Sequence, residues 1–388
     1  MICWIKYFIY IILINIICNI VLYIYSKFKH PFWSKSPVSQ YYQPFNKIGI
    51  ITYYSDPEND KTDMDEPFSW HHFSSLEDMT LLCKLLNDNY LIDDKHQYYY
   101  TLPFIQFILN TPYKHYPSLK NTDRKLWQVL LKHNNDIVGS NTTRPLKLKI
   151  GDNICHSFYV DLLCIKKEFR GKHISPKLIL KMKPAILDIN QSNKHDFGTF
   201  NMFIFKKDHI SLPFNYVCSY KYYYLELDNY NPIEQNENII ELTEEYLFET
   251  FTFFKKHIER FKLYRIYTIE EFSYIFLNDF VRCYIKIDDN NSIIGMISYY
   301  NSQFINKQNK RKSYELLYSI KDENNELIQF ILNKMKEQNT EFLFCTNIMN
   351  NVRYINKYNF TYANTSYYHL YNYHYPKITA KECALCIL

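Results

Sequence analysis

Apolar residues fill the first 25 positions of the chain almost without a break. Over residues 2–25 only Lys6, Asn15 and Asn19 interrupt a run of Ile, Leu, Tyr, Phe, Val, Cys and Trp. About 20 apolar residues are enough for a helix to cross a bilayer, whereas a cleaved signal peptide has a shorter apolar stretch and a small-residue cleavage site. The pattern therefore predicts one transmembrane helix, an anchor over residues 1–27.

Basic residues on either side of this run predict its orientation. Lys27, Lys29 and Lys35 follow it, against the single Lys6 near its start. Positive charge collects on the cytoplasmic side of membrane segments. We therefore expect a single-pass membrane protein whose remaining residues face the cytoplasm.

Two stretches far apart in the chain share one pattern of an apolar strand, an Asn-rich turn and a second strand. The first, LWQVLLKHNNDIVGSNTT, contains Gly139, and the second, VRCYIKIDDNNSIIGMISYY, contains Gly295. Strands around a polar turn are typical of β-hairpins, and a repeated unit indicates internal duplication. We predict an α/β chain with one half at 28–226 and another at 227–388, divided at the polar stretch LDNYNPIEQNEN (227–238).

A buried strand, a basic loop and a helix are predicted after the first hairpin. The strand covers residues 158–165, and the loop after it contains the basic run RGKH. Ser175 is the expected N-cap residue and Pro176 the first residue of the helix. Free amide groups and the helix dipole favour an anion at such a position. This order predicts a phosphate site, and it resembles the acyl-CoA pyrophosphate loop of acetyltransferase-type folds.

Composition narrows the range of functions. The chain has 45 Lys and Arg against 40 Asp and Glu, so its charge does not predict a nucleic-acid partner. Its six glycines form neither the GxGxxG nor the GxxxxGK[ST] pattern of nucleotide-binding loops, and there is no GxSxG elbow. Ten cysteines without a regular framework indicate reduced thiols. The CxxC of Cys383 and Cys386 is interpreted as apolar filling of a strand, and no metal site is expected.

Five segments, in order and at the right spacing, give the chain a specific resemblance to the eukaryotic N-myristoyltransferases. They are HPFWSKSPVS (30–39), PFSW (67–70), LLNDNYLIDD (85–94), VDLLCIKKEFRGKHISPKLI (160–179) and YHLYNYHYP (368–376) with ITAKECALCIL (378–388). The resemblance covers residues 31–388. It implies two pseudo-symmetric acetyltransferase-like halves around one continuous mixed sheet, and it agrees with the internal repeat.

The resemblance also implies an activity. Members of this family move a myristoyl group from myristoyl-CoA to the N-terminal glycine amine of a protein, without a covalent intermediate. We therefore expect an acyltransferase with myristoyl-CoA as its donor substrate, no permanently bound cofactor, and a monomeric state. The first half would hold the acyl-CoA site, and the second half the peptide site and the catalytic C-terminus.

Roles for individual residues follow from the same resemblance. The family's backbone amides that polarise the thioester carbonyl correspond to Leu162 and Leu163, and its general base, the C-terminal carboxylate, corresponds to Leu388. An ammonium of pKa about 8 must lose a proton before it attacks, and a carboxylate in a pocket of low polarity is a suitable acceptor. Asp161 stands where the family has an Asn that helps to handle this proton. The acyl-CoA contacts carry over to Phe32, Trp33, Leu163, Cys164, Ile165, Arg170, Gly171, Lys172, His173, Ile174 and Ser175.

The sequence departs from the family at positions that would handle the amine proton and line the peptide site. Asp161 replaces the Asn, FGTFNMFIFKK (197–207) replaces a Tyr-Thr-Ala-Gly strand, and TYANT (361–365) replaces a glycine-rich loop. These departures leave two alternatives open. The protein could be a non-catalytic module that binds acyl-CoA or lipidated proteins, or an acyltransferase that acts on a different amine.

Overall fold

The computed structural model describes residues 2–42, 47–52, 62–73, 75–90, 94–115, 128–182, 202–233 and 238–388. Its helices are α1 (Ile2–Lys29), α2 (Pro31–Lys35), α3 (Leu76–Asn89), α4 (Leu102–His115), α5 (Ile174–Leu180), α7 (Leu247–Ile258), α8 (Ile269–Phe276), α9 (Glu326–Glu337) and α10 (Val352–Lys357). Its strands are β1 (Gly49–Ile50), β2 (Phe68–His72), β3 (His96–Tyr98), β4 (Gln128–His133), β5 (Asp136–Ile150), β6 (Asn153–Ile165), β7 (Met202–Asp208), β8 (Tyr216–Glu226), β9 (Ile239–Glu241), β10 (Leu263–Arg265), β11 (Val281–Ile287), β12 (Ile293–Asn306), β13 (Lys312–Ile320), β14 (Phe342–Thr346), β15 (Thr361–Tyr371), β16 (Tyr373–His374) and β17 (Cys383–Ala384).

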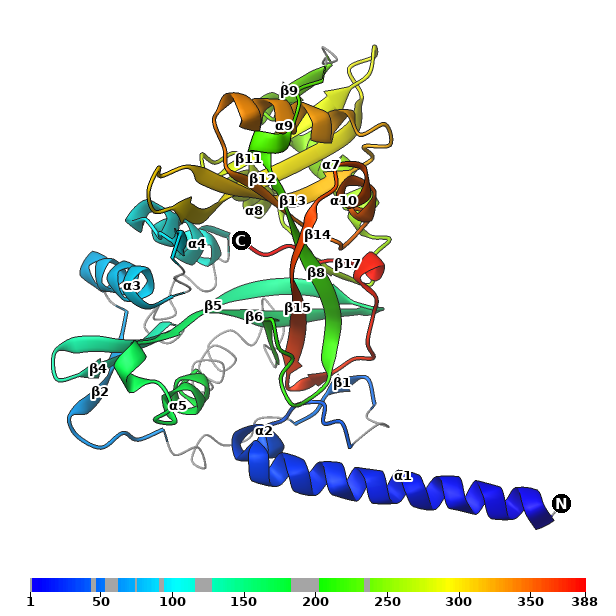
Figure 1. The fold of residues 1–388 in the computed structure, drawn as a ribbon. Coiled ribbons are helices and arrows are strands. Elements are labelled where there is room, and N and C mark those ends of the chain that lie inside the picture. The colour runs from blue at the N-terminus through cyan, green and yellow to red at the C-terminus, as the bar shows by residue number, and fades with distance from the viewer. Residues whose placement is uncertain are drawn as a thin grey trace.

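The apolar run at the start of the chain forms α1, which projects from the rest of the protein (Figure 1). Within its segment Lys6–Lys29, an 18-residue window has a mean hydropathy of 2.3, and none of that window is buried. Ser26, close to α2, is buried. This length and composition fit a membrane span, and they also fit a signal sequence. His30 alone separates α1 from α2, and its N–H donates to the Ser26 carbonyl at 2.9 Å. His30 therefore joins the end of α1 directly to the start of α2.

A mixed sheet passes through both halves of the described chain. Twelve of its strands run in the order β17-β10-β5-β6-β7-β15-β8-β14-β13-β12-β11-β9, with β2, β3 and β4 joined at its sides. Most neighbours are antiparallel, whereas β6 with β7, β13 with β14 and β10 with β17 are parallel. The prediction of an α/β fold with one continuous mixed sheet is confirmed.

The two halves exchange strands. β8 precedes residue 227 but pairs with β14 and β15, which follow it, and β15 pairs in turn with β7. Strands from both sides of the predicted boundary at 226/227 thus alternate at the centre of the sheet. This exchange carries the end of the chain into the middle of the molecule, close to α4 (Figure 1).

The two predicted hairpins are present and occupy equivalent places. β4 pairs with β5 around the turn at Asn134, and β11 pairs with β12 around the turn at Asn291. Each hairpin leads to a third antiparallel strand, β6 or β13, then to a helix, α5 or α9, and then to a parallel strand, β7 or β14. The repeated sequence pattern therefore corresponds to a repeated structural unit.

Helix α5 begins earlier than the sequence predicts. Ile174 is its first residue, and His173 is the N-cap residue, with φ of 57° and no side-chain capping bond. Ser175 is inside the helix and is not its cap, so that prediction was wrong. Pro176 lies in the first turn, where backbone N–H groups lack helical partners and proline is tolerated, so it does not mark the first residue.

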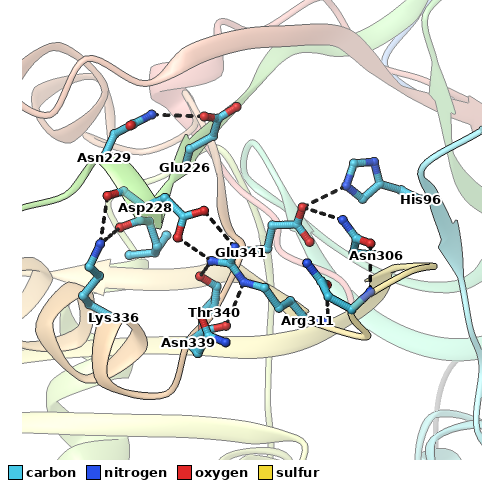
Figure 2. A network of polar contacts seen from close by, with 12 residues as sticks. His96, Glu226, Asp228, Asn229, Asn306, Arg311, Lys336, Asn339, Thr340 and Glu341 are labelled. Atoms are coloured by element: carbon cyan, nitrogen blue, oxygen red, sulfur yellow. Dashed lines mark hydrogen bonds and ion pairs between the residues drawn. The ribbon is translucent and has the colours of Figure 1, made fainter.

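A polar network fastens β3 to the second half of the chain (Figure 2). The carboxylate of Glu341 accepts hydrogen bonds from His96 Nε2 at 3.1 Å and from Asn306 Nδ2 at 3.0 Å. Nearby, both terminal nitrogens of Arg311 donate to Asp228 at 2.8 Å, a bidentate pair of fixed geometry. Because β3 also pairs with the end of β12, this network fixes a short strand that would be unstable alone.

Both hairpin glycines lie beneath a helix. A Cβ atom built at Gly139 would lie 3.2 Å from Leu178 Cδ1 on α5, and one built at Gly295 would lie 2.9 Å from Leu327 Cδ1 on α9 and 3.3 Å from a backbone oxygen. Leu178 and Leu327 are fully buried. Glycine at these two positions lets each helix approach its sheet closely.

We expect Gly295→Ala to lower the free energy of unfolding by about 1–3 kcal/mol, because an added methyl group must displace packed atoms. Gly139→Ala should cost less, since its Cβ has more room. Urea unfolding of the two variants and the wild type measures the difference. Equal stability of all three proteins would contradict the close packing of α9 on β12.

Candidate functional site

A cavity of about 870 Å³ lies between the two halves, where β6 and β7 separate. These strands pair only over residues 157–160 and 202–205. Beyond this point, residues 161–165 of β6 and 205–208 of β7 line the cavity. Two parallel strands that diverge in this way expose backbone and side chains of both to one enclosed space.

The cavity lining contains an apolar set of residues, which we call the apolar end, and a more polar set, which we call the polar end. Residues that line the apolar end are Trp33, Val160, Leu163, Cys164, Ile165, Ile179, Met182, Phe203, Phe205 and Leu212. Residues that line the polar end and its aromatic wall are Tyr90, Tyr98, Tyr100, Phe104, Tyr159, Asp161, Lys206, Asp208, Tyr300, Ser302, Glu315, Ile387 and Leu388. Both halves of the chain thus contribute to the polar end.

A β-bulge shapes the cavity wall at Leu162 and Leu163. β5 pairs Ser140 with Cys164 and Thr142 with Asp161, so the single residue between them faces two residues of β6. Leu162 has φ of 50°, an uncommon value for a residue other than glycine. A bulge leaves its extra residue outside the regular ladder. The two predicted catalytic amides therefore belong to the irregular part of the strand.

Two hydroxyl groups fix the bulge from β5. The Ser140 hydroxyl donates to the Leu162 carbonyl at 2.8 Å, and the Thr142 hydroxyl donates to the Asp161 carbonyl at 3.0 Å. Both side chains are fully buried. Without these two hydroxyl groups, the irregular ladder would leave the backbone oxygens of Asp161 and Leu162 without hydrogen-bond partners in the protein interior.

The Asp161 carboxylate is committed at both oxygens. Oδ1 accepts the Leu162 backbone N–H at 2.8 Å, and Oδ2 accepts Arg144 Nη2 at 2.9 Å. The guanidinium of Arg144 also stacks over the Tyr159 ring at 5.3 Å and is almost completely buried. In this arrangement, one of the two predicted catalytic amides already has an anionic acceptor.

Contacts along the C-terminal segment bring Leu388 into the cavity. The Tyr368 hydroxyl donates to the Leu385 carbonyl at 2.9 Å, and Arg144 donates a short hydrogen bond to the Leu388 backbone oxygen. Cys383 and Cys386 are buried, and burial raises the pKa of Cys386 well above its ordinary value. Among the described residues, no group of His, Cys, Asp or Glu has the arrangement of a metal site.

Aromatic rings form the floor of the apolar end. Trp33 of α2 stacks on Phe205 with centroids 6.2 Å apart and contacts Phe214 at 4.9 Å. His369 of β15 lies behind them, stacked on Phe205. Burial lowers the pKa of His369 to about 3, so its ring is neutral at pH 7. The floor is thus uncharged as well as aromatic.

The structure places the sequence-predicted residues in two groups. Those that line the cavity are Trp33, Asp161, Leu162, Leu163, Cys164, Ile165, Arg170, Ser175 and Leu388. Phe32 packs edge-on against Trp33, and Ile174 is buried beneath the loop. Gly171, Lys172 and His173 form the loop outside the cavity lining, and Gly171 and His173 have φ of 78° and 57°. These positive angles give the loop its tight turn.

Arg170 stabilises this loop by two hydrogen bonds to backbone carbonyl groups. Its Nε donates to the Ile165 carbonyl at 2.9 Å, and its Nη2 donates to the Asn89 carbonyl at 2.6 Å. Two of its donors are therefore used within the protein. The ammonium of Lys172 lies 4.8 Å from the Phe169 ring centroid, and the Lys172 side chain is exposed.

A charged cluster at the polar end was missed by the sequence analysis. Lys206 Nζ donates to the Tyr222 hydroxyl at 3.1 Å, and Tyr222 and Tyr300 each donate to Glu315 at 2.8 Å. Burial by itself would lower the pKa of Lys206, but the carboxylates of Asp208 and Glu315 outweigh it and raise the pKa above its ordinary value. The only signal in the sequence was the change from apolar to charged residues within MFIFKKD.

Comparisons with known proteins agree with this architecture. The profile of the N-terminal domain of myristoyl-CoA:protein N-myristoyltransferase matches residues 48–189, and the profile of its C-terminal domain matches residues 214–384. Glycylpeptide N-tetradecanoyltransferase of Kluyveromyces lactis is 25% identical over 305 residues, and that of Candida albicans is 24% identical over 316 residues. The alignments cover 71% and 70% of this chain but 65% of the length of each relative.

Solved structures share the fold. A crystal structure of Saccharomyces cerevisiae N-myristoyltransferase with bound myristoyl-CoA superposes with a TM-score of 0.78 at 18% identity, over 92% of this chain and 99% of that one. A second structure of the yeast enzyme gives 0.80 at 19% identity, over 94% and 96% of the two chains. The two profiles together match more than half of the sequence. The chain therefore belongs to the N-myristoyltransferase family.

Proposed function

We propose that this protein transfers a myristoyl group from myristoyl-CoA to the N-terminal glycine amine of other proteins. The observation that carries this proposal is that the bulge at Leu162 and Leu163 and the Leu388 terminus line the same cavity. An acyl transfer to an amine needs a group that polarises the carbonyl and a group that accepts the amine proton. The amides of the bulge would supply the first, and the carboxylate of Leu388 the second.

The proposed reaction needs no covalent intermediate. The thioester carbonyl lies at the bulge, where the amides of Leu162 and Leu163 stabilise the developing negative oxygen. The carboxylate of Leu388 takes a proton from the ammonium, and the free amine attacks the thioester carbon. The carbon–sulfur bond then breaks, and the departing thiolate takes the second proton of the amine nitrogen, so that an amide and the thiol form of CoA are the products. Arg144 holds the terminal residue in position through its bond to the Leu388 oxygen.

The proposed acyl-CoA site uses the apolar end of the cavity. Trp33, with Leu163, Cys164 and Ile165, would contact the acyl chain and its thioester, since these residues line that end. The loop of Arg170, Gly171, Lys172, His173 and Ser175 would face the phosphates of CoA. Because Arg170 spends two donors on the protein, Lys172 is the loop cation with the most freedom to meet a phosphate.

A specific contact favours a second candidate, a non-catalytic module that binds acyl-CoA. The Asp161 carboxylate occupies the Leu162 N–H, and a carboxylate beside a developing oxyanion opposes the reaction. For catalysis, this contact must open or the Leu163 amide must act alone. The Asp161 variant described below separates the two candidates.

The terminal carboxylate is tested by changing the end of the full-length chain. Deleting Leu388, or adding residues after it, should lower kcat for transfer from labelled myristoyl-CoA to glycine-terminated peptides by about 10²–10⁴, because the proton acceptor is lost or displaced. Acyl-CoA binding, measured by calorimetry, should stay close to that of the wild type.

Leu388→Met is the matched control, because it keeps the main-chain carboxylate and changes only the side chain. It should retain most of the activity. Undiminished transfer by the extended chain would refute the assignment of the base. Failure of the wild type to acylate any member of a peptide and amine library, despite binding acyl-CoA, would refute the proposed activity.

The Asp161→Asn variant tests the contact at the bulge. Removing the negative charge beside Leu162 should raise kcat by at least about ten-fold, a fraction of what one oxyanion donor contributes. The thermal midpoint and acyl-CoA affinity are measured alongside. A fall in kcat would instead mean that Asp161 itself handles the amine proton, and continued inactivity would favour the binding module.

We also propose that α1 anchors the protein in a membrane with the remaining residues on the cytoplasmic side. The support is its apolar length and the basic residues Lys27 and Lys29 in its last turn. The full chain should float with lipid vesicles after density centrifugation, and a chain without residues 1–27 should not. Cleavage of this segment in cells, as of a signal sequence, would overturn the proposal.

A further inference from the structure

Lys206 lines the polar end of the cavity and has hydrogen-bond donors for which the described residues offer no acceptor. An ammonium group has three N–H donors. Within the described residues it has one hydrogen-bond acceptor, the Tyr222 hydroxyl at 3.1 Å, and the Asp208 carboxylate at 3.7 Å is an ion-pair partner beyond hydrogen-bond distance. Its side chain is 29% accessible and lines the cavity. Two donors can therefore serve a molecule that enters this space.

The surroundings of Lys206 are already fixed by protein contacts. One oxygen of Glu315 accepts from Tyr222, and the other accepts from Tyr300. Asp208 accepts a short hydrogen bond from the Ser366 hydroxyl. These bonds hold both carboxylates in place, so Lys206 cannot gain acceptors from them without breaking other contacts.

The charges at and around Lys206 determine which kind of ligand atom can bind to its ammonium group. Lys206 brings one positive charge, and Asp208 and Glu315 bring two negative charges. A further carboxylate would meet net repulsion in a cavity of low polarity, whereas a neutral carbonyl oxygen accepts a charge-assisted hydrogen bond without that penalty.

Strand pairing places Lys206 beside the C-terminal segment. Lys206 of β7 is in register with Tyr368 of β15, and the Tyr368 hydroxyl holds the Leu385 carbonyl. Both Lys206 and Leu388 line the polar end of the cavity. A peptide whose amine lies at Leu388 would therefore have its first residues close to Lys206.

We propose that Lys206 is a specificity-determining residue that donates a hydrogen bond to a main-chain carbonyl oxygen of the peptide that accepts the acyl group. This inference rests on the proposed function, because it concerns the acceptor end of the same cavity. It has a consequence for substrate class. Amines followed by amide carbonyls are good acceptors, and simple alkylamines of similar size are poor ones.

Thioamide peptides provide the test. Each main-chain carbonyl oxygen near the amine is replaced in turn by sulfur, a weaker acceptor, and KM and kcat are measured with the full-length wild type and with Lys206→Met. In the wild type, one position should raise KM by about ten-fold or more, the value expected for a bond to a charged donor. In Lys206→Met, KM for the normal peptide should rise by a similar factor and the thioamide at that position should cause no further loss.

Other variants separate this role from a general effect on folding. Lys206→Arg keeps the charge and the donors and should restore most of the lost affinity. Lys221→Met removes an exposed lysine of β8 that lies outside the cavity lining and should leave KM unchanged. Tyr222→Phe keeps every charge and removes only the hydroxyl that orients Lys206, so it tests the cluster even where Lys206→Met is unstable, and it should raise the peptide KM several-fold.

The outcomes distinguish this inference from the proposed function. Normal transfer with a KM that is the same in the wild type, Lys206→Met and Tyr222→Phe would refute the role of Lys206 and leave the activity intact. If the wild type transfers no acyl group, calorimetry with the same thioamide peptides and a non-reactive thioether analogue of myristoyl-CoA still measures the hydrogen bond. Equal binding of all thioamide peptides by the wild type would then refute it.

Discussion

A buried guanidinium links the parts of the chain that meet at the cavity. Arg144 of β5 donates to Asp161 of β6 and to the backbone oxygen of Leu388, and its plane covers the ring of Tyr159. A buried cation without partners would cost several kcal/mol, so its position requires acceptors in these places. The same contact joins the bulged strand to the end of the chain. The geometry of the site therefore depends on one arginine in the first half of the sequence.

Strand exchange explains why this contact can form. β15 inserts between β7 and β8, and β8 in turn pairs with β14 of the other half. The residues after β15 then return to the centre of the molecule, where the chain ends (Figure 1), and Leu388 lines the cavity. Removing either half would leave the central strands of the other half with unpaired edges. The duplicated units thus form one sheet, and the site lies where they meet.

Segments that resemble the family and segments that depart from it both line the cavity. The apolar end includes Trp33 and residues 163–165 from the resembling segments, and Phe203 and Phe205 from the divergent segment 197–207. The polar end contains Lys206, Asp208 and Glu315. Tyrosines of β8 and β12 bind Lys206 and Glu315, and Ser366 of β15 donates to Asp208. The hydrogen bonds of Glu315 and Asp208 hold both carboxylates in place, whereas Lys206 keeps donors that have no acceptor among the described residues. Residues of the divergent segment 197–207 thus line both ends of the cavity.

Local patterns in the sequence determined the long apolar helix, both hairpins, the duplication and the order of strand, basic loop and helix after β5. Each of these depends on neighbouring residues, whose spacing and polarity set the backbone conformation. Close approach also explains the repeated glycines, although the leucines above them could be identified only in the structure. The start of α5 was misjudged because a serine before a proline resembles a cap, whereas His173 in a left-handed conformation begins the helix. The bulge at Leu162, the bonds of Arg144 and the cluster around Lys206 were decided by tertiary structure alone. Strand register and the folding of the whole chain bring their partners together, across 17 positions for Arg144 and Asp161, 93 for Tyr222 and Glu315, and 244 for Arg144 and Leu388. No local pattern records which groups a buried charge will meet.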